Sequence, residues 1–342
     1  MNDSFPVLEL AGDPHARGLA CGRAFAPRIA AAWRFYSEQV FTLSAIDATE
    51  IRHRATRVRE LVGDFEPAYC TEIEAMATGA GLEPWQLYCL NARTEILNAA
   101  VGECTAVYFA RGGVLGQTWD WLQPLEELAV ITRTVRPDGR RVLAFCEPGM
   151  LAKIGQNDAG LGVCLNFLLA PHALDGVPVH VVLRAVLDSP DLATARAAIA
   201  RSGHGKASNF LLGDAGGQGL SIEIAGADAA ELAPSEDVLA HTNHCVDARL
   251  AAGRFVIPTS PERLATARRL ATACPTQDVA ALKGVLAGGE DKGTLTVPYH
   301  PEPVLGDLPV GSCATVVMDL GARTMHVRKG PRPDAGYVAV AV

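Results

Sequence analysis

The pattern of side chains changes at residue 104, and this change constrains the fold more than any other feature of the chain. Before it, apolar residues recur with helical spacing, and a proline at position 84 suits the first turn of the last helix. After it, short β-rich runs alternate with turn residues. The sequence therefore predicts a helical block followed by sheets, with the first helices at residues 14–40, 46–62, 65–82 and 84–98.

The region after residue 104 is predicted to form antiparallel hairpins in two groups, separated by helix pairs. Asp138-Gly139 favours a tight turn between two of the strands. This order predicts an α+β layered domain, because a doubly wound fold would alternate strand and helix regularly. Strands are expected at 104–110, 114–121, 128–135, 141–147, 162–169, 209–214, 219–225, 237–243, 313–320 and 324–330, helices at 178–187, 190–202, 261–273 and 276–287, and the longest loop at 288–311.

A glycine-rich run, "GDAGGQG" at residues 213–219, invites comparison with a phosphate-binding loop. Such a loop joins a strand to a helix, whereas this run stands between two predicted strands. We therefore interpret it as a hairpin turn.

Composition excludes several classes of function. The 342 residues are 49% hydrophobic, which is ample for a core, and the net charge is −8 without any basic block. A nucleic-acid or membrane partner is therefore not expected. The nine cysteines are scattered and form no C-x-x-C pair, and nothing reads as a signal peptide. We expect free thiols, a cytoplasmic protein and no cofactor.

Cys104 stands at the first residue of a predicted strand, and the next strand returns antiparallel and ends in Trp119-Asp120-Trp121. Strand pairing should bring Asp120 close to Cys104. A carboxylate beside a thiol raises the pKa of that thiol, so the pair makes chemical sense where the carboxylate also faces an ammonium group. A free amino terminus on Cys104 would supply one. The alternative is that Cys104 is a buried structural thiol.

Three motifs in order make the chain recognisable: "LNARTEI", "GECTAVYF" and "GQTWDW". Together they resemble the acyl-coenzyme A:6-aminopenicillanic acid acyltransferase family, peptidase family C45, whose members are N-terminal-nucleophile hydrolases. The resemblance extends to "LELAGDPHARGLACGRAF" near the amino end, which looks like the opening strand and helix of the family, and to "CATVVMDLGARTMHVRKG" near the carboxyl end, and so covers essentially the whole chain. It implies a single domain with the four-layer αββα sandwich of these hydrolases.

The resemblance also implies self-processing between Glu103 and Cys104, giving segments 1–103 and 104–342. The new α-amine, with an ordinary pKa near 8, would then activate the thiol. Glu103 departs from the glycine that is frequent at this position in the family. Asn243 matches the family's oxyanion donor, and Asp120 is assigned to orienting the Cys104 ammonium.

Other residues are candidates for the site on position alone. His241 and His244 invite a metal interpretation, but residues three apart on a strand point to opposite faces, so we predict no metal. Arg93 and Glu95 are interpreted as a structural ion pair, or as part of the site. One of the two tryptophans should enter the core and the other should line the acyl pocket. The predicted substrate-binding residues are Thr105, Trp119, Trp121, Asn209 and Ser312.

The favoured function is a self-processing amidohydrolase or acyltransferase that acts on a small N-acyl amide or acyl thioester through acyl-Cys104. The first alternative is an uncleaved, inactive relative that acts as a binding or scaffold protein. A second is a hydrolase without self-cleavage, in which a histidine such as His244 serves Cys104. The oligomeric state and the identity of the substrate are left open.

Overall fold

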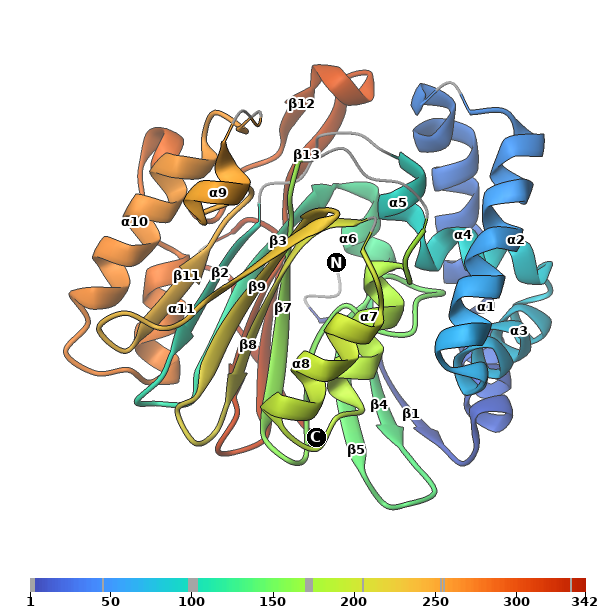
Figure 1. Ribbon diagram of the computed structural model, residues 1–342, viewed down its shortest axis with the longest axis horizontal. Coiled ribbons are helices and arrows are strands. Elements are labelled where there is room, and N and C mark those ends of the chain that lie inside the picture. Colours follow the sequence, from blue (N-terminus) through green and yellow to red (C-terminus); the bar gives the residue numbers. More distant parts are fainter. Residues whose placement is uncertain are drawn as a thin grey trace.

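The protein folds into four layers, helices–sheet–sheet–helices, with a further helical block beside the sandwich (Figure 1). The structure is a computed structural model that describes residues 4–44, 46–97, 104–169, 175–204, 206–252, 254, 256–332 and 334–342. The two sheets pack face to face through β2 (Thr105–Phe109) and β3 (Val114–Leu122) on one side and β7 (Leu161–Phe167) and β8 (Lys206–Asp214) on the other. The predicted αββα sandwich is confirmed.

The first sheet contains eight strands among the described residues, in the order β1-β4-β5-β6-β7-β8-β9-β10. Neighbouring strands are antiparallel except β1 and β4, which run parallel. The strands not yet given are β1 (Val7–Ala11), β4 (Val130–Val135), β5 (Arg141–Cys146), β6 (Ile154–Asn157), β9 (Gly219–Gly226) and β10 (Asp228–Leu232).

The second sheet has the order β11-β2-β3-β13-β14-β15, with β12 paired on β13, and it carries Cys104. Thr105 pairs with Thr118, so Cys104 lies at the sheet end where β3 reaches Asp120. The β3–β13 register shifts between Ser312 and Ala314, a β-bulge at the same end. The remaining strands are β11 (Val238–His241), β12 (His300–Glu302), β13 (Leu308–Asp319), β14 (Thr324–Lys329) and β15 (Val338–Ala341).

Helix pairs cover the outer faces of both sheets. The first pair, α7 (Val179–Leu187) and α8 (Leu192–Arg201), packs on β6, β7 and β8. The second pair, α10 (Ser260–Thr272) and α11 (Val279–Leu286), packs on β2, β3, β11 and β13. Short elements complete this part: α6 (Pro124–Leu128), α9 (Ala248–Ala251) and the 3₁₀ turns η3 (Asp291–Gly293) and η4 (Pro303–Leu305).

The helical block, drawn in blue to teal in Figure 1, precedes Cys104 and is held together by a close helix pair. A Cβ added at Gly18 or Gly22 would lie 2.1 or 2.2 Å from a backbone carbonyl of the facing helix, so only glycine permits this approach. Within the described residues no helix is both long and apolar enough to cross a membrane. The block contains α1 (Pro14–Phe35), η1 (Tyr36–Val40), η2 (Phe41–Ser44), α2 (Ala48–Phe65), α3 (Pro67–Ala80), α4 (Pro84–Asn91) and α5 (Arg93–Leu97).

The helix boundaries follow local sequence signals. Asp47 caps α2 by accepting from the backbone N–H groups of residues 49 and 50. Gly81 ends α3 with a φ of 69°, so the helix runs past Gly79. The helix predicted at 84–98 is two helices, α4 and α5, that meet at Ala92.

The strand predictions were confirmed for the hairpins and incomplete elsewhere. "GDAGGQG" is the β8–β9 turn, as predicted. Four short strands, β6, β10, β12 and β15, were not predicted. The predicted loop at 288–311 was wrong in part, because it holds η3, β12, η4 and the start of β13. These pieces are only three to five residues long and pair with distant partners, so their sequences carry little periodic signal.

Candidate active site

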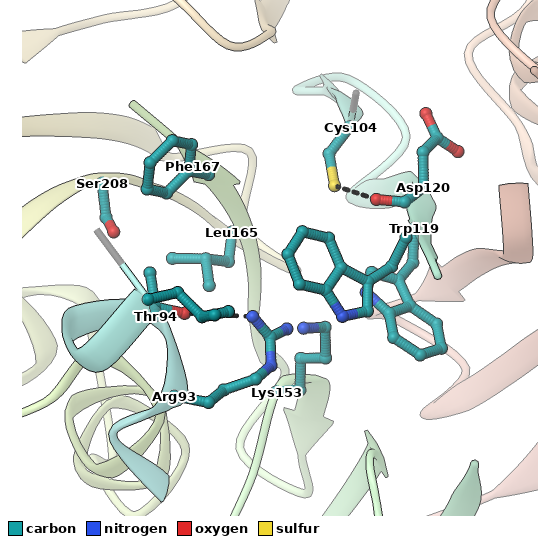
Figure 2. A pocket seen from close by; sticks show the side chains of 11 residues that line it. Arg93, Thr94, Cys104, Trp119, Asp120, Lys153, Leu165, Phe167 and Ser208 are labelled. Atoms are coloured by element: carbon teal, nitrogen blue, oxygen red, sulfur yellow. Dashed lines mark hydrogen bonds between the residues drawn. The ribbon is translucent and has the colours of Figure 1, made fainter. Parts of the chain in front are cut away.

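Cys104 lines a hollow between the end of the sandwich and the last helix of the helical block (Figure 2). The hollow holds about 510 Å³ of space free of protein atoms, including its open mouth. It is lined by Arg93, Thr94, Leu97, Cys104, Trp119, Asp120, Trp121, Lys153, Leu165, Phe167 and Ser208.

The Cys104 thiol is buried and protonated as it stands. Its Sγ donates a weak hydrogen bond to the Asp120 carbonyl oxygen at 3.9 Å. Burial, reinforced by the Asp120 carboxylate, raises the pKa of Cys104 to about 11. A nucleophilic role therefore requires a group that removes the thiol proton.

Asp120 joins β3 to β13 at the bulge. Its Oδ1 accepts a hydrogen bond from Ser312 Oγ at 2.5 Å, and its Oδ2 accepts one from Thr118 Oγ1 at 3.2 Å. Ser312 is buried and also accepts from the Val297 backbone N–H, and it is not among the lining residues. The proximity of Asp120 and Cys104, predicted from the hairpin, is confirmed.

Two buried side chains hold the backbone carbonyl of Cys104. Asn166 Nδ2 donates to this oxygen from β7 at 3.0 Å, and Arg263 Nη1 donates to it from α10 at 3.1 Å. Arg263 Nη1 also donates to Thr105 Oγ1 at 3.0 Å, so Thr105 faces the arginine rather than the pocket. Two donors on one carbonyl fix the orientation of the residue that bears the thiol.

The same arginine orients Asn243. Arg263 Nη2 donates to Asn243 Oδ1 at 2.9 Å. The side-chain nitrogen of Asn243 therefore points away from Arg263. That nitrogen, Nδ2, donates to the carbonyl of the pocket residue Phe167 at 3.0 Å, and the Asn243 backbone N–H donates to Ser260 Oγ. An amide NH₂ carries two donors, but Asn243 is fully buried and is not among the residues that line the pocket.

Asn209 takes part through a relay of buried hydrogen bonds. Ser221 Oγ donates to Asn209 Oδ1 at 2.6 Å, and Asn209 Nδ2 donates to Asn166 Oδ1 at 3.2 Å. Asn209 does not line the pocket, whereas its neighbour Ser208 does. Asn209 thus supports the side chain that holds the Cys104 carbonyl.

Both Trp119 and Trp121 line the pocket and both belong to the buried core, so the expected division of one into the core and the other into the pocket was wrong. Residues two apart on a strand share one face, which the sequence interpretation had reversed. Trp121 Nε1 donates to Tyr36 Oη at 2.8 Å. A cation also lies over each ring. Lys153 Nζ is 4.9 Å from the centroid of the Trp119 ring, and the Arg93 guanidinium is 4.5 Å from the centroid of the Trp121 ring.

Arg93 is paired with Glu147, so the predicted structural pair with Glu95 was wrong. Arg93 Nη2 and Lys153 Nζ both donate to Glu147 Oε1, at 2.6 and 3.0 Å. Burial alone would raise the pKa of Glu147, but the two cations hold it well below its usual value. Glu95 instead accepts from the backbone N–H of Val179.

The two histidines of "HTNH", His241 and His244, contact different side chains. His241 contacts Glu223 through Nε2 and the Thr242 carbonyl through Nδ1, each at 2.7 Å. His244 Nδ1 lies 2.7 Å from Ser260 Oγ, and burial lowers the pKa of His244 to about 4. Neither histidine lines the pocket. Among the described residues, no group of three or more His, Cys, Asp or Glu side chains could hold a metal ion.

Sequence reasoning missed Arg263, Asn166, Lys153 and Glu147. One signal for Arg263 was available: it precedes Leu264 and stands four residues before Ala267, and both are buried. It therefore occupies the apolar side of an amphipathic helix. Asn166 likewise interrupts an apolar strand. Glu103 lies outside the described residues.

The four-layer αββα arrangement is the fold of the N-terminal-nucleophile hydrolases. The chain belongs to the family described as Acyl-coenzyme A:6-aminopenicillanic acid acyl-transferase, which matches residues 110–297. It is therefore an enzyme of an acyl-transferring family. The matched range includes Asn166, Asn243 and Arg263 and begins just after Cys104.

Individual relatives have related names. A protein of Emericella nidulans named acyl-coenzyme A:6-aminopenicillanic-acid-acyltransferase 40 kDa form is 28% identical over 243 residues, which cover 69% of this chain and 68% of that protein. A penicillin V acylase from Agrobacterium tumefaciens is 13% identical, with a TM-score of 0.46 over 69% of this chain and 85% of its own. A mutant of a conjugated bile acid hydrolase from Clostridium perfringens is 10% identical, with a TM-score of 0.46 over 70% of this chain and 92% of its own.

Proposed function

We propose that the protein is a self-processing cysteine hydrolase or acyltransferase that moves the acyl group of a small N-acyl compound through an acyl-Cys104 intermediate. One observation carries this proposal: the chain fixes the carbonyl of Cys104 with two donors and leaves its thiol on the wall of an open pocket. A structural thiol would need neither feature.

Processing precedes catalysis. The Cys104 sulfur attacks the Glu103 carbonyl carbon, the bond from that carbon to the Cys104 nitrogen breaks, and the thiol proton passes to the nitrogen. Water then hydrolyses the thioester, which gives a carboxylate on segment 1–103 and a free thiol and α-amine on segment 104–342. The amine supplies the base that the protonated thiol lacks.

Catalysis uses the same sulfur on a substrate amide or thioester. The α-amine accepts the thiol proton, the sulfur attacks the acyl carbon, and the oxyanion that forms accepts a hydrogen bond from Asn243 Nδ2. The bond to the leaving group breaks, and the leaving group takes the proton. Water or an acceptor amine then attacks the acyl-thioester and restores the thiol. His244 is a poor candidate for the base that accepts the Cys104 thiol proton, because its side chain contacts Ser260 and does not line the pocket.

Self-processing is tested on the purified wild-type chain. Intact-mass and amino-terminal sequence analysis should find a second terminus at Cys104 and a companion fragment that ends at Glu103. Finding only the intact chain after prolonged incubation, with no acyl transfer to Cys104, would refute the proposal. That result would favour the uncleaved binding protein.

Asp120 sets the pH dependence of the thiol. Its carboxylate disfavours the thiolate and stabilises a neighbouring ammonium, so it raises the pKa of both groups. Removing the charge lowers both values. We therefore expect Asp120→Asn to move the rising limb of Cys104 alkylation by iodoacetamide to lower pH by about one unit or more, read by peptide mass.

Asp138→Asn makes the same change in net charge in the exposed β4–β5 turn and should leave the alkylation profile unchanged. Identical profiles for Asp120→Asn and the wild type would remove Asp120 from the electrostatics of the thiol.

A further inference from the structure

Two cations border a pocket that is otherwise mainly apolar. Lys153 and Arg93 both donate to the single carboxylate of Glu147, and the buried carboxylate of Glu95 also acts electrostatically on Arg93. The side chains of Lys153 and Arg93 are only 4% and 6% exposed, yet both residues line the hollow that holds Cys104 (Figure 2). Buried charges are costly unless they are paired, so two cations on the wall of one pocket require a physical reason.

Glu147 has no capacity left to balance both cations. Its Oε2 accepts from Tyr36 Oη at 2.6 Å and from Arg93 Nε, and its Oε1 accepts from Arg93 and Lys153. The Arg93 donors are directed mainly at this carboxylate. Asp120, the acidic residue that lines the pocket, is engaged with Ser312 and Thr118.

Lys153 is the cation with donors to spare. An ammonium carries three N–H groups, and in the described part of the chain this one donates a single hydrogen bond, to Glu147. Its remaining close contact is the face of Trp119, 4.9 Å from the ring centroid. Burial and the adjacent Arg93 lower the pKa of Lys153, so a second anion in the pocket would stabilise its charged form.

We propose that Lys153, supported by Arg93 and Glu147, binds a carboxylate of the substrate in the Cys104 pocket. The apolar wall of Leu97, Leu165, Phe167 and the two tryptophans would then hold the body of the same molecule. The preferred substrates are thus N-acyl compounds with an apolar body and a carboxylate, carried on the acyl side or on the amine side. This inference rests on the proposed acyl transfer at Cys104.

Matched pairs of compounds test the subsite and locate the carboxylate. N-phenylacetylglycine and N-phenylacetylglycinamide differ only by a charge on the amine side. Glutaryl-p-nitroanilide and its primary-amide analogue differ only by a charge on the acyl side. The wild type should prefer the charged member of at least one pair in kcat/KM by about 10- to 100-fold, the range of a charge-assisted hydrogen bond.

Lys153→Met should abolish this preference, read as the ratio of kcat/KM within each pair, and Lys153→Arg should restore part of it. Lys329→Met is the matched control. Lys329 is also buried, donates to Glu127 at 2.7 Å and lies over the ring of Phe5, but it does not line the pocket. This control should keep the wild-type preference.

A second readout needs no turnover. The charged compounds should slow iodoacetamide labelling of Cys104 in the wild type and in Lys329→Met, but not in Lys153→Met. Equal kcat/KM values within both pairs in the wild type, or equal losses on charged and uncharged compounds in Lys153→Met, would overturn the inference and leave acyl transfer intact. If none of the four compounds is turned over, the labelling result still decides the subsite, and it is the acyl-transfer proposal that fails.

Discussion

Cys104→Ala is expected to remain a single chain of 342 residues and to transfer no acyl group. The thiol is the attacking group in both reactions, so its removal should lower turnover by about 10⁶-fold, as removal of the nucleophile does in other hydrolases. Intact mass reports processing, and release of the leaving amine reports turnover. The fold should persist, because Asn166 and Arg263 bind the backbone carbonyl of residue 104 and not its side chain.

Cys104→Ser separates chemistry from packing at the same position. A hydroxyl can attack the preceding carbonyl, but it is a weaker nucleophile than a thiol. We expect slow or partial processing and a rate well below that of the wild type.

Cys89→Ala is the matched control for the loss of a buried thiol. Cys89 donates to a backbone carbonyl at 3.9 Å, the same distance as for Cys104, and burial raises its pKa to about 12. It does not line the pocket. This variant should process and turn over normally. Equal effects of the two alanine variants would show that Cys104 acts only through packing.

The sequence alone predicted the part of the site whose residues lie close together in the chain. Cys104 and Asp120 lie on one hairpin, so strand pairing alone predicts that they meet, and the structure places the thiol 3.9 Å from the Asp120 carbonyl. The αββα layers followed from the order of hairpins and helix pairs together with the family resemblance.

The rest of the site could not be predicted from local pattern. Arg263 reaches Cys104 from 159 positions along the chain, and Asn166 from 62. Neither contact leaves a periodic signature, since each depends on how the outer helix and the facing sheet dock. The cluster of Arg93, Glu147 and Lys153 likewise combines α5 with the segment between β5 and β6. Only the polar character of these residues within apolar runs was visible beforehand.

If Asn243 is the oxyanion donor that the family resemblance assigns, Asn243→Ala should lower kcat by about 10²–10³-fold, because loss of such a donor costs about 2.7–4 kcal/mol in other hydrolases. The same variant leaves Arg263 Nη2 without its acceptor, so some loss of stability is expected as well. The alanine variant alone therefore mixes catalysis with structure.

Asn243→Asp separates the effect on catalysis from the effect on stability. A carboxylate keeps an oxygen acceptor for Arg263 but removes the N–H donor and places a negative charge beside the developing oxyanion. We expect at least as large a loss of kcat as with alanine. The hydrogen bond to the Phe167 carbonyl is lost while the contact with Arg263 is kept, so we expect a melting temperature between those of the alanine variant and the wild type. Single-turnover acylation of Cys104, followed by intact mass, isolates the step in which the oxyanion forms.

Asn157→Ala provides the control for losing a buried amide. The Asn157 side chain donates to the carbonyls of Leu187 and Ser189 at 2.9 and 2.7 Å and accepts from the Leu161 N–H, and it does not line the pocket. This variant should melt at a lower temperature and keep its acylation rate. An Asn243→Asp enzyme that acylates within about threefold of the wild-type rate would assign Asn243 to anchoring Arg263 alone, and the oxyanion would then need a different donor.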